Sequence, residues 1–441
     1  MRVLLVSTYE LGHQPLHVAA PAAALEAAGH RVWTLDVSVE AWEPSVLDGV
    51  DAVAFSVPMH TAMRLSRKGA EAVKRRRPDM PVCLYGLYAV VSREDSLARL
   101  ADRVIAGEYT QELVAWADGL DASREVDLRR QRAHLPVRSS LPPLERYAHL
   151  AMDGEERPVG YVEATHGCAY RCRHCPVPVV YDGRTRKVPV EVVLADVAQL
   201  VEAGARHITF GDPDFLNRFR HATEVVEAVH TRFPDLTYDV TTKVEHVLRH
   251  RDLLGVLRDT GCLFCVSAFE ILDDRILELL DKGHTASDAA VAVDLLREHA
   301  IEPRPSWLPF TPWTTVSDLR DICDFVVRHD LVGNVDPVQY SIRLLIPEGS
   351  LVLDIPQVAP YLGPYDAEHL TYTWRAADQR TVPLQRRLAR IAEDATATIA
   401  QTFGDVRDAV LEACGERTTD REPILAGSVE GRPRLTEPWF C

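Results

Sequence analysis

The first 118 residues alternate short apolar runs with stretches of helical periodicity. The expected strands are 2–7, 31–39, 51–57, 81–86 and 103–107, and the expected helices are 17–29, 62–77 and 110–117. Strands separated by helices of this length form a parallel sheet that is covered on both faces. We therefore expect residues 1–118 to form a doubly wound α/β domain, with its ligand site beyond the carboxyl ends of the strands.

The strand and helix alternation resumes after a break at residues 119–158, which carry charges and prolines without a clean period and are expected to be a linker. The strand-like runs that follow are 159–165, 206–211, 236–242, 262–269, 301–310 and 337–346. Six βα units are too few for a closed eight-stranded barrel. Residues 159–360 are therefore expected to form a partial, TIM-like (β/α)6 barrel with an active site at the carboxyl ends of its strands. Residues 361–441 are expected to form a C-terminal helical region with a polar tail.

Acidic residues outnumber basic ones by 65 to 49, and the formal net charge is −16. A nucleic-acid surface neutralises phosphates with an excess of cations, so this balance argues against nucleic acid as a partner. The basic run at 129–138 is interpreted as a solvated part of the linker, and the alternative is a local basic groove. No apolar run reaches the roughly 18 residues of a membrane helix, and the N-terminus lacks a signal-peptide cleavage site. We expect a cytoplasmic protein with no membrane partner.

The strongest chemical signal is the segment THGCAYRCRHCPVP at 165–178, in a loop after the first strand of the second domain. It places Cys168, Cys172 and Cys175 at C-x3-C-x2-C spacing. Thiolates bind iron–sulfur clusters, and a loop lets three sulfurs converge on one cubane. Three ligands leave one iron of a four-iron cluster open to a chelating group. The alternative is a zinc site with His166 or His174 as its fourth ligand.

This motif, at this position in a βα barrel, resembles that of radical S-adenosylmethionine (radical SAM) enzymes. The resemblance implies a [4Fe–4S] cluster on the three cysteines, SAM bound to the open iron, and reductive cleavage that releases a carbon radical. It also implies a small-molecule substrate and an electron donor of the flavodoxin or ferredoxin type. The residue before the third cysteine is usually aromatic in that family and lies near the adenine. Here it is His174.

Later strand ends of the second domain resemble the segments that contact SAM in that family, and the fourth-strand segment resembles that of its cobalamin-type members. The resemblance implies contacts from Gly211 with Asp212 or Asp214 to the methionine amino group, from Lys243 to the carboxylate, and from Ser267 and Glu270 to the ribose or the amino end.

The N-terminal domain resembles the cobalamin-binding fold that is often fused to radical SAM barrels. Gly107 and Glu108 match the Gly-Glu turn after the fifth strand, Gly86 matches a glycine turn, and Ser56 ends the third strand. The resemblance implies cobalamin as a further cofactor. The Asp-x-His-x-x-Gly cobalt-ligand signature is missing. The alternative is a domain that binds no corrinoid.

Residues 159–217 and the Trp-Phe-Cys ending resemble a radical SAM family named for its Cys-Cys-Ala-Glu-Pro or Cys-Sec-Ala-Glu-Pro tail. The resemblance implies a catalytic or substrate-carrying role for Cys441. Arsinothricin-type members imply transfer of a 3-amino-3-carboxypropyl group to trivalent arsenic, which suits soft thiolates such as Cys414 or the Cys262/Cys265 pair.

We therefore predict a radical SAM enzyme that modifies a small molecule. One alternative is a corrinoid-dependent radical methyltransferase. An alternative of another class is a metal- or corrinoid-binding sensor that does no chemistry.

Overall fold

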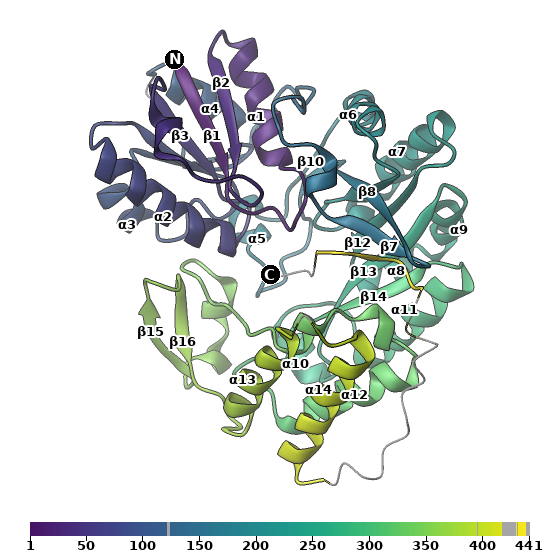
Figure 1. Cartoon of the computed structure of the whole chain (residues 1–441). Coiled ribbons are helices and arrows are strands. Elements are labelled where there is room, and N and C mark those ends of the chain that lie inside the picture. Colours follow the sequence, from purple (N-terminus) through teal and green to yellow (C-terminus); the bar gives the residue numbers. More distant parts are fainter. Residues whose placement is uncertain (121–123, 395, 417–428, 430, 438–441) are drawn as a thin grey trace.

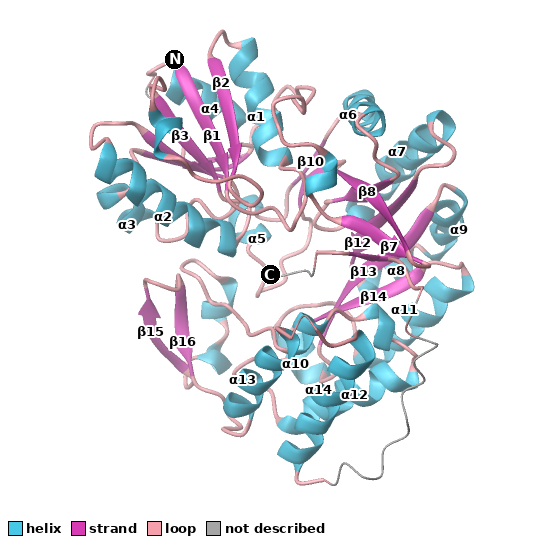
Figure 2. Cartoon of the chain, viewed as in Figure 1, coloured by secondary structure: helices cyan, strands magenta, loops and turns pink. Residues whose placement is uncertain are grey.

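The computed structural model describes residues 1–120, 124–394, 396–416, 429 and 431–437. Figure 1 shows the N-terminal domain beside a larger curved sheet, with the C-terminal helices below it. Figure 2 separates the helices from the strands in the same view and shows helices on the outer side of the curved sheet. Both sheets alternate with helices along the chain, as the apolar periodicity predicts.

The N-terminal domain is a six-stranded parallel sheet in the order β2-β1-β3-β4-β5-β6. Its elements are β1 (Arg2–Ser7), α1 (Leu16–Ala27), β2 (Arg31–Asp36), β3 (Ala52–Ser56), α2 (His60–Arg76), β4 (Val82–Tyr85), α3 (Arg93–Arg99), β5 (Arg103–Gly107), α4 (Thr110–Ala117) and β6 (Val126–Asp127).

Alternate side chains of these strands enter two separate apolar clusters. Leu5 of β1 packs in the cluster that includes Leu113 of α4, whereas Leu4 packs in the cluster that includes Met63 of α2. Successive strand side chains point to opposite faces, so each face of the sheet needs its own helical cover. The doubly wound fold is confirmed, and its strand order reverses between β1 and β3, where such folds bind ligands.

The second sheet has seven strands in the order β14-β13-β12-β11-β8-β7-β17. The strands β8 and β11–β14 run parallel, and β7 and β17 extend the sheet antiparallel. Its elements are β7 (His149–Met152), β8 (Glu155–Val162), α6 (Val190–Glu202), β11 (His207–Phe210), α7 (Phe219–Arg232), β12 (Thr237–Thr242), α8 (Val244–Arg249), α9 (Arg251–Asp259), β13 (Cys262–Glu270), α10 (Asp274–Leu279), α11 (Ala286–Glu298), β14 (Glu302–Trp307), α12 (Val316–Arg328) and β17 (Arg434–Leu435).

The predicted partial barrel is confirmed. The prediction of a sixth full strand at 337–346 is wrong. Pro337–Tyr340 forms a 3-10 helix, and only an isolated parallel bridge joins Phe310 to Arg343. Proline at the first helical position has the backbone angle that a helix requires and lacks the N–H that a strand ladder uses. The open edge of the barrel after β14 is therefore irregular.

The segment at 119–158 crosses between the two sheets, beginning with β6 in the first and ending with β7 in the second. The buried side chain of Arg138 holds this linker in place through hydrogen bonds. Its guanidinium donates to Asp196 on α6 at 2.8 and 3.0 Å and to the Tyr161 carbonyl at 2.7 Å. It also donates to the Gln14 side chain at 3.3 Å. The buried bidentate pair with Asp196 thus joins the linker to the second domain, and the contact with Gln14 joins it to the first.

The C-terminal region also touches the N-terminal domain. A hairpin of β15 (Leu362–Asp366) and β16 (Thr371–Trp374) precedes α13 (Thr381–Ala392) and α14 (Ile399–Cys414). Leu370 of the hairpin turn is buried in the cluster beneath α2, and the His369 carbonyl lies 2.8 Å from Nε2 of His60. The predicted C-terminal helices therefore follow a hairpin that the hydrophobic pattern did not predict.

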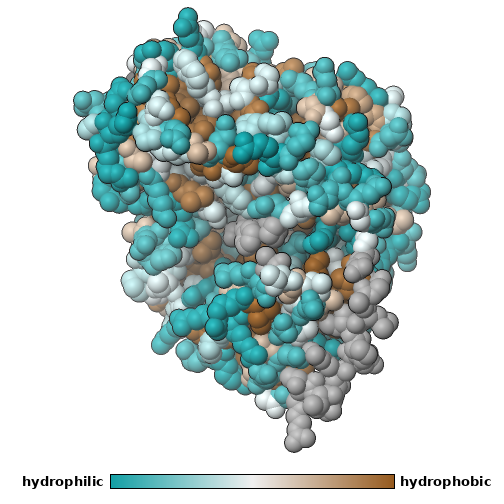
Figure 3. Space-filling model, in the orientation of Figure 1, coloured by the Kyte–Doolittle hydropathy of each residue, from teal (hydrophilic) through white to brown (hydrophobic). Residues whose placement is uncertain are grey.

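The visible face of the molecule in Figure 3 is mostly hydrophilic, with apolar side chains in separate patches. Within the described part of the chain, no helix has both the length and the apolar character needed to cross a membrane.

Candidate active site

The three motif cysteines lie in a partly buried loop between β9 (Thr165–Gly167) and α5 (Val177–Tyr181). β9 pairs antiparallel with β10 (Thr185–Lys187), which fixes both ends of the loop. The thiols of Cys168 and Cys172 are less than a tenth exposed. Burial and repulsion from the other two thiols raise the pKa of Cys175 to about 12. A positively charged metal centre offsets both effects, because it binds the deprotonated thiolates.

Other residues support the loop without belonging to the motif. Asn217 donates to the sulfur of Cys168 at 3.2 Å and accepts from the Ala169 N–H at 3.3 Å. The loop also packs against Ala106 of the N-terminal domain. Among the described residues, no three His, Cys, Asp or Glu side chains are grouped as the ligands of a single metal ion. The three thiols nevertheless belong to one loop, and thiolates are the donors that iron–sulfur clusters use.

Glu270 lies at the end of β13, where strand pairing is irregular and its own φ is +65°. Its carboxylate accepts from Lys282 at 2.8 Å and lies 3.1 Å from Nε2 of His174. Burial alone would raise the pKa of Glu270, but Lys282 and His174 outweigh burial and hold the pKa below its ordinary value. A left-handed backbone at a non-glycine residue is strained, and such strain is concentrated at functional sites.

Lys282 connects this carboxylate to the cysteine loop. Burial lowers its pKa, but the charges of Glu270 and Cys172 more than compensate, so the pKa is raised overall. The ammonium group is therefore a buried cation beside the thiols, where it favours their thiolate form. Lys282 was not among the residues predicted from sequence, although it follows Glu270 by 12 residues in the chain.

Asp212 and Asp214 both lie buried after β11, but hydrogen bonds within the protein engage both carboxylates. Asp212 accepts from Thr165 Oγ1 at 2.5 Å and from the Ala164 N–H at 2.9 Å. Burial raises its pKa to about 7. Asp214 accepts from Thr242 Oγ1 at 2.8 Å, and its carboxylate lies 3.0 Å from Nδ1 of His246. Both residues therefore tie neighbouring strand ends together, and their predicted contact with SAM stays a prediction.

The other predicted positions on this sheet are also packed. The ammonium of Lys243 lies 3.5 Å from the ring centre of Tyr170 in the cysteine loop, so it forms a cation–π contact. Ser267 donates to the Thr242 carbonyl at 2.9 Å. A side chain at Gly211 would meet the Tyr161 hydroxyl at 1.9 Å. The structure thus explains these residue types by packing, and their contacts with SAM stay predictions.

A cavity of about 680 Å³ separates the two domains, and the predicted turns of the N-terminal domain lie at its wall. Gly86 and Gly107 have φ values of +120° and +79°, and a side chain at Gly107 would lie 2.3 Å from the Asp127 carbonyl. Glu108 lines the cavity directly, whereas Ser56 lies behind it with its hydroxyl 3.5 Å from Glu10. The carboxyl ends of the first sheet therefore face the barrel across this cavity.

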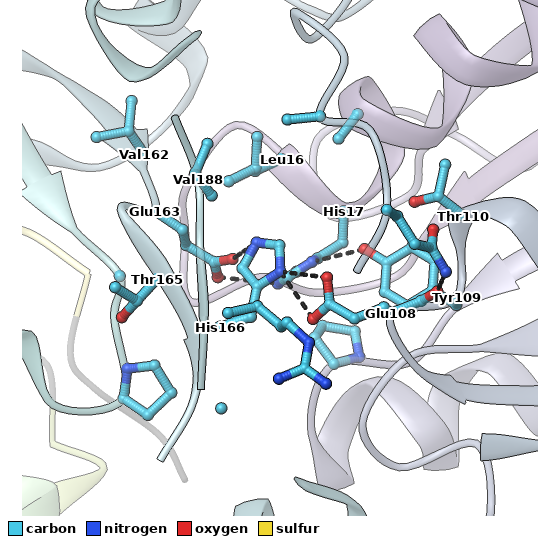
Figure 4. Close-up of a pocket in the computed structure, with 18 of the residues that line it drawn as sticks. Leu16, His17, Glu108, Tyr109, Thr110, Val162, Glu163, Thr165, His166 and Val188 are labelled. Atoms are coloured by element: carbon cyan, nitrogen blue, oxygen red, sulfur yellow. Dashed lines mark hydrogen bonds and ion pairs between the residues drawn. The ribbon is translucent and has the colours of Figure 1, made fainter. Parts of the chain in front are cut away.

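An alternating series of carboxylates and imidazoles occupies one side of the cavity (Figure 4). Glu163 lies between His17 and His166, with oxygen–nitrogen distances of 3.4 Å to each. The other ring nitrogen of His166 lies 3.0 Å from Glu108, and that of His17 lies 3.0 Å from the Tyr109 hydroxyl. Residues from both domains thus form one buried ionic network. The sequence pointed to Glu108 as a cofactor contact and to His166 only as an alternative zinc ligand. His17, Glu163 and Tyr109 match no local motif.

We expect the protein to lose stability as the pH rises from about 6.5 to about 9 because of His17. Burial lowers the pKa of His17, but Glu163 and Glu10 outweigh it and raise the pKa to about 9. A raised pKa in the folded state gives stability that is complete below the unfolded value and is lost as the pH passes the folded value. Urea unfolding of the wild type and of His17→Asn across this range tests the effect. Parallel curves for the two proteins would contradict it.

Comparisons with known proteins agree with this geometry. Residues 162–326 match the family model of the radical SAM superfamily, and residues 2–117 match that of the B12 binding domain. Radical SAM domains work with a [4Fe–4S] cluster and SAM, and B12 binding domains bind cobalamin. The cysteine loop lies in the first match, and the turns at Gly86 and Gly107 lie in the second.

A tRNA-2-methylthio-N(6)-dimethylallyladenosine synthase from Halorhodospira halophila is 26% identical over 325 residues, which cover 70% of this chain and 63% of that protein. The chain thus spans less than two thirds of that relative's length. An uncharacterized methyltransferase from Pyrococcus horikoshii is 23% identical over 209 residues, which cover 46% of this chain and 44% of the relative. Both similarities are too distant to carry over a substrate.

Two solved structures share the fold. The radical SAM methyltransferase TsrM from Kitasatospora setae, with tryptophan and a SAM analogue bound, has a TM-score of 0.66 and 16% identity, covering 94% of this chain and 95% of that one. The cobalamin-dependent radical enzyme OxsB, with aqua-cobalamin and SAM bound, has a TM-score of 0.65 and 14% identity, covering 87% and 65%. The matched ranges show that the chain carries a radical SAM domain at 162–326 and, in front of it, a B12-binding domain at 2–117.

Proposed function

We propose that this protein is a cobalamin-dependent radical SAM methyltransferase that acts on a small molecule. The observation that carries the proposal is the interdomain cavity, whose walls are the strand ends of the B12-binding domain on one side and the segment leading into the cysteine loop on the other. A carrier held by one domain can then meet SAM held by the other. The TsrM and OxsB structures support this arrangement through their shared fold.

In this proposal Cys168, Cys172 and Cys175 hold the [4Fe–4S] cluster. The cluster supplies the electron that cleaves a carbon–sulfur bond of SAM, and cobalamin supplies a methyl carrier. The protein's own groups position these cofactors. Glu270 is a fixed anion that can accept from the SAM amino group or ribose, and Lys282 and His174 keep it ionised.

The test is product analysis of anaerobically reconstituted full-length protein with SAM, a strong reductant and hydroxocobalamin. Removal of the methyl group leaves S-adenosylhomocysteine, which we expect to accumulate in a cobalamin-dependent manner. 5′-Deoxyadenosine alone would indicate a radical SAM reaction without methyl transfer. Methylthioadenosine would indicate transfer of the 3-amino-3-carboxypropyl group instead. Bound corrinoid without any SAM product would favour the sensor alternative and contradict the proposal.

A second candidate is methylthio transfer to tRNA, which the name of the Halorhodospira halophila relative favours. The net charge of −16 weighs against it, because tRNA binding needs an excess of cations. Incubation with bulk tRNA and SAM, followed by nucleoside analysis, separates the two functions. A sulfur-containing nucleoside would support the second candidate.

Transfer to arsenic stays a prediction that no observation here favours. Burial raises the pKa of Cys262 and Cys265 far above the ordinary value for a thiol, so both stay protonated in the core. Cys414 also has a raised pKa because of its burial, and its thiol points to the Val316 carbonyl. Cys441 lies outside the described residues, so its predicted catalytic role rests on sequence resemblance alone.

A further inference from the structure

The rim of the interdomain cavity carries a cluster of basic side chains. The cluster consists of Arg130, Arg132, Arg186, Lys187 and Arg218, which together are called the basic rim. The first two come from the linker, and the others come from β10 and the 3-10 helix Phe215–Arg218. The sequence alone suggested that the run at 129–138 is merely solvated. Residues 130–134 of that run in fact line the cavity.

The side chains of the basic rim form no ion pair with a carboxylate of the described residues. Arg129, next to the rim, is paired with Asp127 and Glu112 at 2.7 Å. Arg186 still lies near enough to Glu108 for its charge to lower the pKa of that carboxyl, although the two form no ion pair. Cations without an ion-pair partner stand out in a chain of net charge −16, although the same cavity also has carboxylates in its lining, Glu108 and Glu163 among them. Such cations attract anions.

A second observation, on Arg186, points to a hydrogen-bond partner that is not part of the chain. Its two terminal nitrogens donate to the carbonyls of Thr185 and Leu128, while its Nε is buried and has no hydrogen-bond partner. Buried donors are normally satisfied, so an unpaired one points to a ligand or ordered water. Arg186 is also the cross-strand neighbour of His166, which ties the rim to the ionic network. Arg218 is held in place by donating to Thr185 Oγ1 at 2.6 Å.

We propose that the basic rim is a binding site for a phosphate or carboxylate group of a small molecule in the interdomain cavity. Guanidinium groups present planar pairs of donors that match the oxygens of both anions. The site deepens the proposed function, because it lies in the same cavity. Two sources can supply the anion. One is the phosphate in the nucleotide tail of cobalamin, and the other is an acidic group of the substrate.

The test compares two triple variants with equal charge change. The rim variant is Arg130→Gln, Arg132→Gln and Lys187→Gln, all of which alter exposed side chains. The control variant is Lys68→Gln, Arg75→Gln and Arg76→Gln, which alters exposed side chains of α2 outside the cavity lining. Each full-length protein is titrated with hydroxocobalamin, with cobinamide, which lacks the nucleotide and its phosphate, and with inorganic pyrophosphate after cobalamin saturation.

If the anion belongs to cobalamin, the rim variant binds cobalamin about tenfold or more weakly than the control variant, because charged hydrogen bonds are lost. Its cobinamide affinity then equals that of the control variant. If the anion belongs to the substrate, cobalamin affinity is unchanged and the rim variant loses pyrophosphate binding about tenfold or more. Equal affinities of the rim and control variants for all three probes would overturn the proposal.

Failure of the proposed function gives a different result. Wild-type protein would then bind neither cobalamin nor cobinamide, and pyrophosphate is titrated into the corrinoid-free protein. Weaker pyrophosphate binding by the rim variant would still support the anion site in that case, and equal binding would overturn it. Arg186→Gln serves as a single-site check, since it removes the guanidinium with the buried unpaired Nε.

Discussion

Replacing any one of Cys168, Cys172 and Cys175 with alanine is expected to abolish both cluster absorbance and SAM cleavage. Two thiolates cannot hold a four-iron cubane with a single open iron, so the site for SAM is lost with the third ligand. The measurements are the visible absorbance and iron content of anaerobically reconstituted protein, and the yield of SAM cleavage products under a strong reductant.

The matched control for these variants is Cys414→Ala. Its thiol is partly buried on α14 and donates to a backbone carbonyl, outside the cysteine loop. This variant should keep the iron content and the cleavage yield of the wild type. Cleavage retained by any of the three loop variants would exclude the ligand assignment. Stable zinc in protein purified in air would favour the zinc site instead.

The second large effect is expected from Lys282→Met. The change removes the nearest cation of Glu270 and leaves a buried carboxylate with only His174 beside it. Breaking a buried ion pair from one side costs about 3–5 kcal/mol, because the remaining charge is uncompensated. We expect the free energy of unfolding at pH 7 to fall by about that amount. SAM cleavage should fall as well, since Glu270 is no longer held ionised.

The double variant Lys282→Met with Glu270→Gln separates stability from function. Removing both charges restores most of the lost stability, because neither member of the pair is left alone. Cleavage should stay low, because the carboxylate proposed to contact SAM is gone. Urea denaturation measures the first effect, and the yield of cleavage products measures the second. Recovery of cleavage in the double variant would show that Glu270 acts only through stability.

Some positions were predictable because their signals are local. The cysteine spacing is contiguous in sequence, and the continuous apolar runs of β1 and β3 are typical of parallel strands that are buried on both faces. Glycine turns such as Gly107 could be matched to a family pattern because a positive φ restricts the residue type. At 337–346 the local signals conflict. The apolar pattern predicts a strand, whereas the proline favours the 3-10 helix that the structure shows.

The sequence by itself determined the two domain types, the strand and helix alternation, and the loop that carries Cys168, Cys172 and Cys175. Only the tertiary structure decided which charges meet: Glu163 with His17 and His166, Glu270 with Lys282, and the unpaired cations of the basic rim. The physical reason is the distance along the chain over which each kind of interaction acts. Backbone periodicity and motif spacing act over a few residues, whereas a buried ion pair depends on how distant segments dock and on the solvent they exclude.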